Sequence, residues 1–188
     1  MTRKEVKDEL YTQLRKQQHV TIKLTERDKK KARDFADKVA EAKVVEGIYK
    51  RDNKGISERH YVGKIGEIAI EKLLMTSYVD YSIGNSHKYG IPDLRDAGYE
   101  IGVKTTKKQN GVIFVPATPK YPQIVCVFDE VNSLVHIMGL ITVETMKQYG
   151  DEELLPPFIS PSYKKGFGKY TEITPLTREL IDKYKSRI

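Results

Sequence analysis

Residues 92–106 constrain the fold of this chain more than any other segment, because they place acids and a lysine where two short strands would meet. In a β-strand, side chains at positions i, i+2 and i+4 share one face. Glu100, Gly102 and Lys104 would therefore point to one side, while the apolar residues between them point into a core. The segment predicts two short strands that flank a turn at residues 96–98.

Further runs rich in β-branched and aromatic residues predict more strands. These runs cover residues 78–81, 112–115, 123–128 and 134–138, and residues 129–133 are typical of a hairpin connection between the last two. We therefore expect a sheet whose central strands lie in the second half of the chain.

Apolar residues at helical spacing predict the helices. A thin stripe runs through residues 4–19, and Thr25 can cap a second helix with a strong apolar period. Residues 63–74 are apolar around most of their circumference, which predicts a largely buried helix. Short helices are expected from Thr142 to Gly150 and over residues 177–184.

The chain carries 33 Lys and Arg against 26 Asp and Glu, a net charge of +7. This excess fits a polyanionic partner such as nucleic acid, and it also fits an ordinary solvated surface. No run approaches the ~20 apolar residues of a membrane helix, and the first residues lack the apolar centre of a signal peptide. We expect no membrane contact and a cytoplasmic location.

Cysteine and histidine usage argues against two classes of site. The single cysteine, Cys126, lies in an apolar run and is expected to be a buried, inert thiol, so disulfides and cysteine-based zinc sites are excluded. His19 and His136 have no partners at metal-ligand spacing in the sequence, so a zinc site is not expected.

The acids and the lysine suit phosphodiester hydrolysis, which needs a shielded phosphate, an activated water and a stabilised leaving oxygen. Magnesium held by one or two carboxylates meets these needs. Asp93, an acid on the next strand, Lys104 and Glu67 from the helix at 63–74 would form such a set. The alternative for Glu67 is a salt bridge to a nearby lysine or arginine.

The order of these residues resembles the PD-(D/E)XK, or restriction endonuclease-like, nuclease superfamily. The shared pattern is Gly63-x-x-Gly66-Glu67 on a helix, then Pro92-Asp93, then a strand that ends in Lys104-Thr105-Thr106. The resemblance implies an α/β (α+β) fold with a central mixed β-sheet flanked by helices. It also implies a Mg²⁺- or Mn²⁺-dependent DNA endonuclease of phage or prokaryotic type.

The resemblance covers about residues 25–175, which we expect to form the nuclease domain, and it also assigns roles. Residues 1–24 are expected to form an N-terminal basic arm or helix, and residues 176–188 a C-terminal helix. By position, Asp93 is the first metal ligand, Glu67 assists metal or water, and Lys104 is the catalytic lysine.

The chain departs from the family pattern at Gly102, where a second acidic ligand should stand two residues before the lysine. Glu100 shares the strand face and is one candidate substitute, although it starts roughly 6.6 Å farther back. A glycine at this position also fits a nuclease fold that only binds DNA, and it fits an inactivated variant. Glu100 can equally be a surface residue paired with Lys107.

Basic residues outside the central motif are candidates for contacts with DNA, and RNA is not excluded. Residues 50–55, with Arg59 and His60, have no periodicity and predict a polar loop that is either a DNA contact or a plain linker. The candidate contacts are Arg51, Lys54, Arg59, His60, Lys64, His87, Lys107, Lys108, Lys164 and Lys165. Double-strand cutting would need two sites, hence a homodimer.

Overall fold

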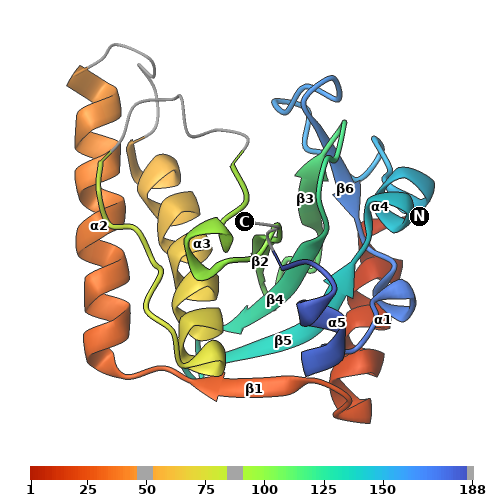
Figure 1. Ribbon diagram of the computed structural model, residues 1–188. Helices are drawn as coiled ribbons and strands as arrows, with labels where there is room; N and C mark the ends of the chain where they lie inside the picture. The colour runs from red at the N-terminus through yellow and green to blue at the C-terminus, as the bar shows by residue number, and fades with distance from the viewer. Residues whose placement is uncertain (46–52, 84–90, 186–188) are drawn as a thin grey trace.

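The structure is a computed structural model that describes residues 1–45, 53–83 and 91–185 (Figure 1). In chain order its helices and strands are α1 (Arg3–Lys16), β1 (Val20–Lys23), α2 (Glu26–Val45), α3 (Asn53–Leu74), η2 (Arg95–Ala97), β2 (Gly102–Lys107), β3 (Ile113–Pro116), β4 (Gln123–Asp129), β5 (Leu134–Ile141), α4 (Val143–Tyr149), β6 (Lys164–Phe167), η3 (Tyr170–Glu172) and α5 (Arg178–Asp182).

A mixed sheet in the order β1-β5-β4-β2 forms the centre of the molecule. Strand β2 runs parallel to β4, whereas β4–β5 and β5–β1 are antiparallel pairs. Strands β3 and β6 form a small second sheet. The prediction of a mixed α/β fold with helices around a central sheet is confirmed, and β2 is an edge strand of that sheet.

Each face of the central sheet packs against its own core, and successive residues of β4 alternate between the two. Ile124, Cys126 and Phe128 face the helices α2 and α3. Val125 and Val127 face the side where α1 and the second sheet lie, as Figure 1 shows. Because both faces are covered, every residue of β4 is buried, which explains its nearly continuous apolar sequence.

Side-chain caps define where at least four described helices begin: Thr2 caps α1, and the sequence predicts the starts of α2 at Thr25 and α4 at Thr142. Before α2, the Asp28 amide donates to the Thr25 hydroxyl, and the Thr25 amide donates to the Asp28 carboxylate. Thr142 caps α4 and Thr177 caps α5 in the same way. Each hydroxyl accepts from a backbone N–H that has no partner within the helix.

Two local predictions for the first half of the chain are wrong. Arg59 and His60 belong to α3, which begins at Asn53. The helix forms there because apolar residues such as Ile56 pack into the core. The many charged residues in this segment obscure the helical spacing of the apolar ones in the sequence. Residues 78–81 form no strand. There Tyr78 is fixed by its side chain, whose hydroxyl donates to the Glu67 carbonyl, and not by a strand ladder.

Around the central motif the strand prediction is only half right. Strand β2 begins at Gly102, so Glu100 precedes it, and Asp93 lies in a turn that leads into η2. Backbone hydrogen bonds close residues 94–101 into a compact loop, with the Leu94 amide donating to the Ile101 carbonyl. That pairing replaces the expected hairpin.

Residues at both ends of the chain join this packed body. Strand β1, within the predicted arm, pairs with β5, and Val6 and Leu10 of α1 are buried against the second sheet's core. Near the C-terminus, Ile181 of α5 is buried in the core beneath α3. Within the described ranges, no helix is both long and apolar enough to cross a membrane.

The close approach of α3 to β2 depends on Gly66, and this contact gives a test of the packing. A Cβ atom built on Gly66 would collide with the Thr105 hydroxyl, whereas one on Gly63 would meet nothing within 4 Å. We expect Gly66→Ala to lower the free energy of unfolding by about 1–3 kcal/mol. Gly63→Ala, the matched control on the same helix, should raise it by about 0.5–1 kcal/mol. Urea denaturation measures both, and equal effects of the two substitutions would contradict this packing.

Candidate active site

Asp93 is held against the outer edge of the central sheet. The Val103 amide points away from β4 and donates to Asp93 Oδ2 over 2.6 Å. The turn that carries the acid is closed by a bond from the Arg95 amide to the Pro92 carbonyl. The Asp93 side chain keeps 33% of its exposure, so one carboxylate oxygen is fixed while the group remains open to a ligand.

Lys104 lies beside this carboxylate. Its Nζ is 3.9 Å from Asp93 Oδ2 and donates to the Val103 carbonyl over 3.2 Å. Since Thr105 faces α3, the pleat of β2 turns Lys104 to the opposite face, where the second sheet lies. The strand thus presents its ammonium group on the face predicted from the alternation.

Glu67 reaches the same cluster from α3. Lys64 Nζ donates to Glu67 Oε2 over 2.6 Å and to the Asp80 carbonyl over 2.9 Å. Burial raises the pKa of the Glu67 carboxyl; Lys64 and Lys104 oppose the rise, and Asp93 adds to it. The salt bridge expected as the alternative role for Glu67 therefore forms, and Glu67, Asp93 and Lys104 also lie close enough to interact.

Two further residues lie near Asp93: Lys164, which is predicted from the sequence only as a nucleic-acid contact, and Tyr121, which is not predicted. Burial lowers the pKa of Lys164, with Lys104 adding to the fall and Asp93 opposing it. Burial raises the pKa of Tyr121, and the charges of Asp93 and Glu100 raise it further. Lys164 belongs to the second sheet and Tyr121 to the loop before β4, so only the tertiary fold places them here.

Gly102 is covered by a side chain from the neighbouring strand. In the parallel register Gly102 lies opposite Gln123 of β4. A Cβ atom at position 102 would lie 2.8 Å from Gln123 Cδ and 2.9 Å from Nε2, and closer still to Oε1. The amide of Gln123 therefore occupies the space that a side chain at position 102 would need.

The Gln123 amide is only half satisfied. Nε2 donates to the Tyr121 carbonyl over 3.3 Å, whereas Oε1 is buried with no hydrogen-bond partner. A buried polar atom without a partner costs about 1–3 kcal/mol. The orphaned oxygen lies over Gly102, one residue before Val103, whose amide holds Asp93.

Glu100 lies before the strand that carries Lys104 and not on it. It precedes β2, its side chain is exposed, and its amide donates to the Tyr184 carbonyl over 2.8 Å. Its charge acts on Tyr121. The position lies at the rim of the cluster, toward α5.

The lysines after Lys104 on β2 are engaged at the other end of the strand. Lys107 pairs with Glu58 and Glu130, each at 2.6 Å, and Lys108 pairs with Asp129 at 2.6 Å. At ~3.3 Å per residue, Lys107 lies roughly 17 Å along the strand from Gly102. These two lysines therefore serve the packing of β2 against α3 and the β4–β5 turn.

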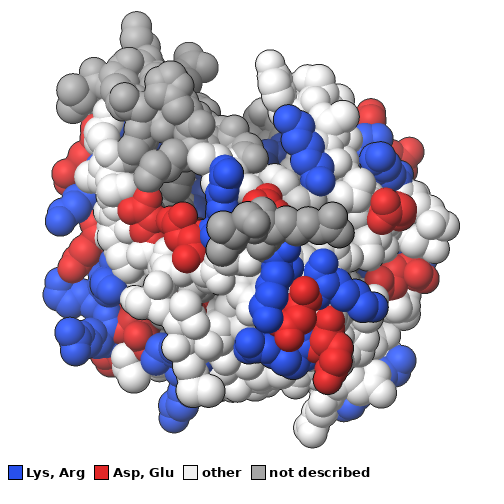
Figure 2. Space-filling model, in the orientation of Figure 1, with Lys and Arg blue, Asp and Glu red and all other residues white. Residues whose placement is uncertain are grey.

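The other predicted nucleic-acid contacts are scattered. Lys64 is only 7% exposed and holds Glu67, and Lys165 pairs with Glu152 at 3.4 Å. Arg59 is exposed on α3, whereas Arg51, His87 and the side chain of Lys54 lie outside the described part of the structure. Figure 2 shows basic and acidic side chains mixed over the face it presents, without a broad area of one sign.

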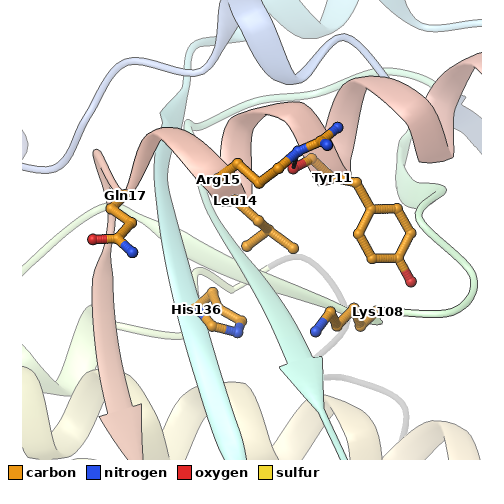
Figure 3. Close-up of a pocket in the computed structure, with 6 residues that line it drawn as sticks. All are labelled: Tyr11, Leu14, Arg15, Gln17, Lys108 and His136. Atoms are coloured by element: carbon orange, nitrogen blue, oxygen red, sulfur yellow. Dashed lines mark hydrogen bonds between the residues drawn. The ribbon is translucent and has the colours of Figure 1, made fainter.

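A cavity of about 590 Å³ opens between α1 and β5, lined by Tyr11, Leu14, Arg15, Gln17, Lys108 and His136 (Figure 3). His19 Nε2 lies 3.0 Å from His136 Nδ1, a contact that the sequence did not predict. No third histidine, cysteine or acid in the described ranges completes a metal site there or elsewhere. The cavity is separate from the cluster around Asp93.

The cluster around Asp93 suits an oxygen-coordinated cation better than a soft one. Its acidic groups are the carboxylates of Asp93 and Glu67, whose charges act on each other, and carboxylate oxygens are hard donors. Such donors match Mg²⁺ or Mn²⁺. A cation would also relieve the raised pKa of Glu67, because positive charge favours the ionised carboxylate.

His60, one of the predicted contacts, gives a test by pH. Burial lowers its pKa to about 4, with help from Lys43, Arg59 and Lys64, and Lys43 Nζ lies 3.0 Å from its Nε2. Because the unfolded histidine binds a proton near pH 6.5, the folded state loses stability as the pH falls from 6.5 toward 4.

We expect His60→Gln to reduce this loss between pH 7 and pH 5 by about 1 kcal/mol, after a discount for solvent screening. Urea denaturation at pH 7, 6 and 5 measures it. A variant that loses as much stability as the parent protein would show that His60 is protonated in the fold.

Comparison with protein-family models, with curated proteins and with solved structures finds no match for this chain. What the cluster can do chemically follows from its own side chains: two carboxylates, two lysines from different sheets and one unpaired amide oxygen around the edge of β2.

Proposed function

We propose that this protein is a metal-dependent nuclease that hydrolyses phosphodiester bonds in DNA, with Glu67, Asp93 and Lys104 at its centre. The observation that carries the proposal is the meeting of these three residues from a helix, a turn and an edge strand. Their order also resembles the PD-(D/E)XK pattern.

Each residue has a role in this proposal. Asp93 and Glu67 would hold Mg²⁺ or Mn²⁺, which when bound acidifies water and offsets charge on the phosphate. Lys104, whose ammonium is fixed by the Val103 carbonyl, orients the attacking water and balances negative charge that develops on phosphorus. Lys164 approaches from the second sheet and meets a phosphate oxygen of the backbone.

The partner in this proposal is DNA, with RNA as the alternative polyanion, and the net charge of +7 supports either. Nicking requires one site, whereas cutting both strands requires two, supplied by a homodimer. In this proposal the protein would encounter and cut its substrate in the cytoplasm.

Cleavage of supercoiled and linear DNA with Mg²⁺ or Mn²⁺ tests the proposal. We expect Asp93→Asn and Lys104→Ala to lower the cleavage rate by about 100-fold or more, since even a partner of a metal ligand is worth 10–100-fold. Asparagine still accepts from the Val103 amide, so the turn should keep its structure. Asp96→Ala in the same turn and Lys147→Ala on α4 are matched controls and should retain full activity. Absence of cleavage of every DNA and RNA form would refute the enzyme proposal.

A second candidate is a nuclease fold that binds nucleic acid without cutting it. The observations that favour it are the glycine at position 102 and the absence, in the described part of the chain, of any group of three His, Cys, Asp or Glu able to hold a metal. In this case Lys104 and Lys164, near Asp93, would bind the phosphates of the nucleic acid without any metal ion.

Salt dependence tests this second candidate. We expect the logarithm of DNA affinity to fall linearly with the logarithm of salt concentration, by about 0.9 per phosphate contacted. Lys164→Ala should reduce the slope by about that amount, and Lys147→Ala should leave it unchanged. Fluorescence anisotropy with labelled DNA measures the slope, and binding that is independent of salt would exclude a backbone-gripping module.

A further inference from the structure

Gln123 is a polar residue in an apolar strand, and it is only 1% exposed. The remaining residues of β4 up to Phe128 are apolar and pack into one of the two cores. A buried glutamine at this position needs a reason, since an aliphatic side chain would suit a strand that is covered on both faces.

We propose that the amide oxygen of Gln123 is a ligand of the cation in the Asp93 cluster, in place of the side chain that position 102 lacks. The inference rests on the proposed function, because it completes the same site. It assigns the third oxygen donor to the strand next to the lysine's strand.

The register of the two strands supports the exchange. Gly102 and Gln123 are paired across the parallel ladder, and the Gln123 amide fills the space of a Cβ atom at position 102. Any side chain at 102 would displace it. The absence of a side chain at Gly102 therefore leaves room for the Gln123 amide. That amide lies where the family pattern has an acidic side chain.

The orientation of the amide leaves its buried oxygen without a hydrogen-bond partner. Nε2 is engaged by the Tyr121 carbonyl at 3.3 Å, while Oε1 has no partner. Position 102 adjoins Val103, whose amide holds Asp93, and Lys104 follows on the same strand face. The unpaired oxygen over Gly102 is thus one residue along β2 from the amide that holds Asp93.

The chemistry of the donor agrees with the cation. Amide carbonyl oxygen is a hard, neutral ligand that Mg²⁺, Mn²⁺ and Ca²⁺ all accept. A neutral third donor offsets less of the cation's positive charge than a third carboxylate would. The bound cation therefore attracts a phosphate oxygen more strongly, although the site binds the cation less tightly.

Binding of Mn²⁺ alone, without DNA, tests the assignment by calorimetry and by the loss of the free-ion paramagnetic resonance signal. Gln123→Met keeps the length of the side chain and removes the oxygen, so it should weaken Mn²⁺ at least tenfold. Gln123→Glu should bind as tightly as the parent protein or more tightly. Thr105→Val is the matched control: it removes a different buried, unpaired oxygen, which belongs to β2 and faces α3, and it should leave the affinity unchanged.

A double variant tests the exchange directly. Gln123→Ala removes the amide and opens the space over Gly102, and it should weaken Mn²⁺ as Gln123→Met does. Adding Gly102→Asp to Gln123→Ala should restore binding to within a few-fold of the parent protein. The single substitution Gly102→Asp must push the amide aside and should give less tight binding than the double variant.

The outcomes separate the two proposals. Weaker Mn²⁺ binding in both Gln123→Met and Asp93→Asn, with Thr105→Val unchanged, supports the assignment. Weaker binding in Asp93→Asn alone overturns the role of Gln123 and leaves the metal site standing. Binding that neither substitution alters overturns the metal site and the role of Gln123 together. Circular dichroism and thermal unfolding confirm that each variant is folded, and a misfolded Gln123→Met leaves the decision to the Gly102→Asp/Gln123→Ala pair.

Discussion

The hydrogen bond from the Val103 amide to the Asp93 carboxylate is the interaction on which the arrangement of the site depends. An edge strand exposes backbone donors that have no ladder partner. Here the acid satisfies one of them, and the turn that carries it covers the outer side of β2. The same bond fixes the carboxylate 3.9 Å from Lys104, so the edge of the sheet is capped and the acid is positioned by one contact.

Charge is arranged around that contact from both faces of the sheet. On the face covered by α3, Lys64 forms a salt bridge with Glu67 of the same helix. On the opposite face, Lys104 and Lys164 lie on the side of the second sheet. Burial alone would disfavour every one of these charges. Burial raises the pKa of Glu67 and lowers that of Lys164, so each charged form is disfavoured. A bound metal ion would stabilise the Glu67 carboxylate, and a bound phosphate would stabilise the Lys164 ammonium.

The sequence predicts those parts of the fold whose signals are local. The apolar period of residues 63–74 lies within α3, the apolar runs match β4 and β5, and helices begin after Thr25 and Thr142 as expected. Strands β1 and β6 escape notice because they are short and half exposed, and they exist through pairing with distant segments. The site follows the same rule: Lys104 can be placed by alternation, whereas Lys164, Tyr121 and Gln123 reach it only through the register and packing of other strands.

Register also changes what a missing side chain means. Along one strand, Gly102 looks like the loss of a functional group, and Glu100 is the nearest substitute on the same face. Across a ladder, however, the paired residue of the next strand is closer than residues i ± 2 on the same strand, because strands lie about 4.8 Å apart whereas alternate residues are about 6.6 Å apart. A group at position 123 can therefore stand in for a side chain at position 102 over a shorter distance than a group at position 100 can. Whether a strand motif is intact must for this reason be judged on the two-dimensional lattice of the sheet and not along the chain.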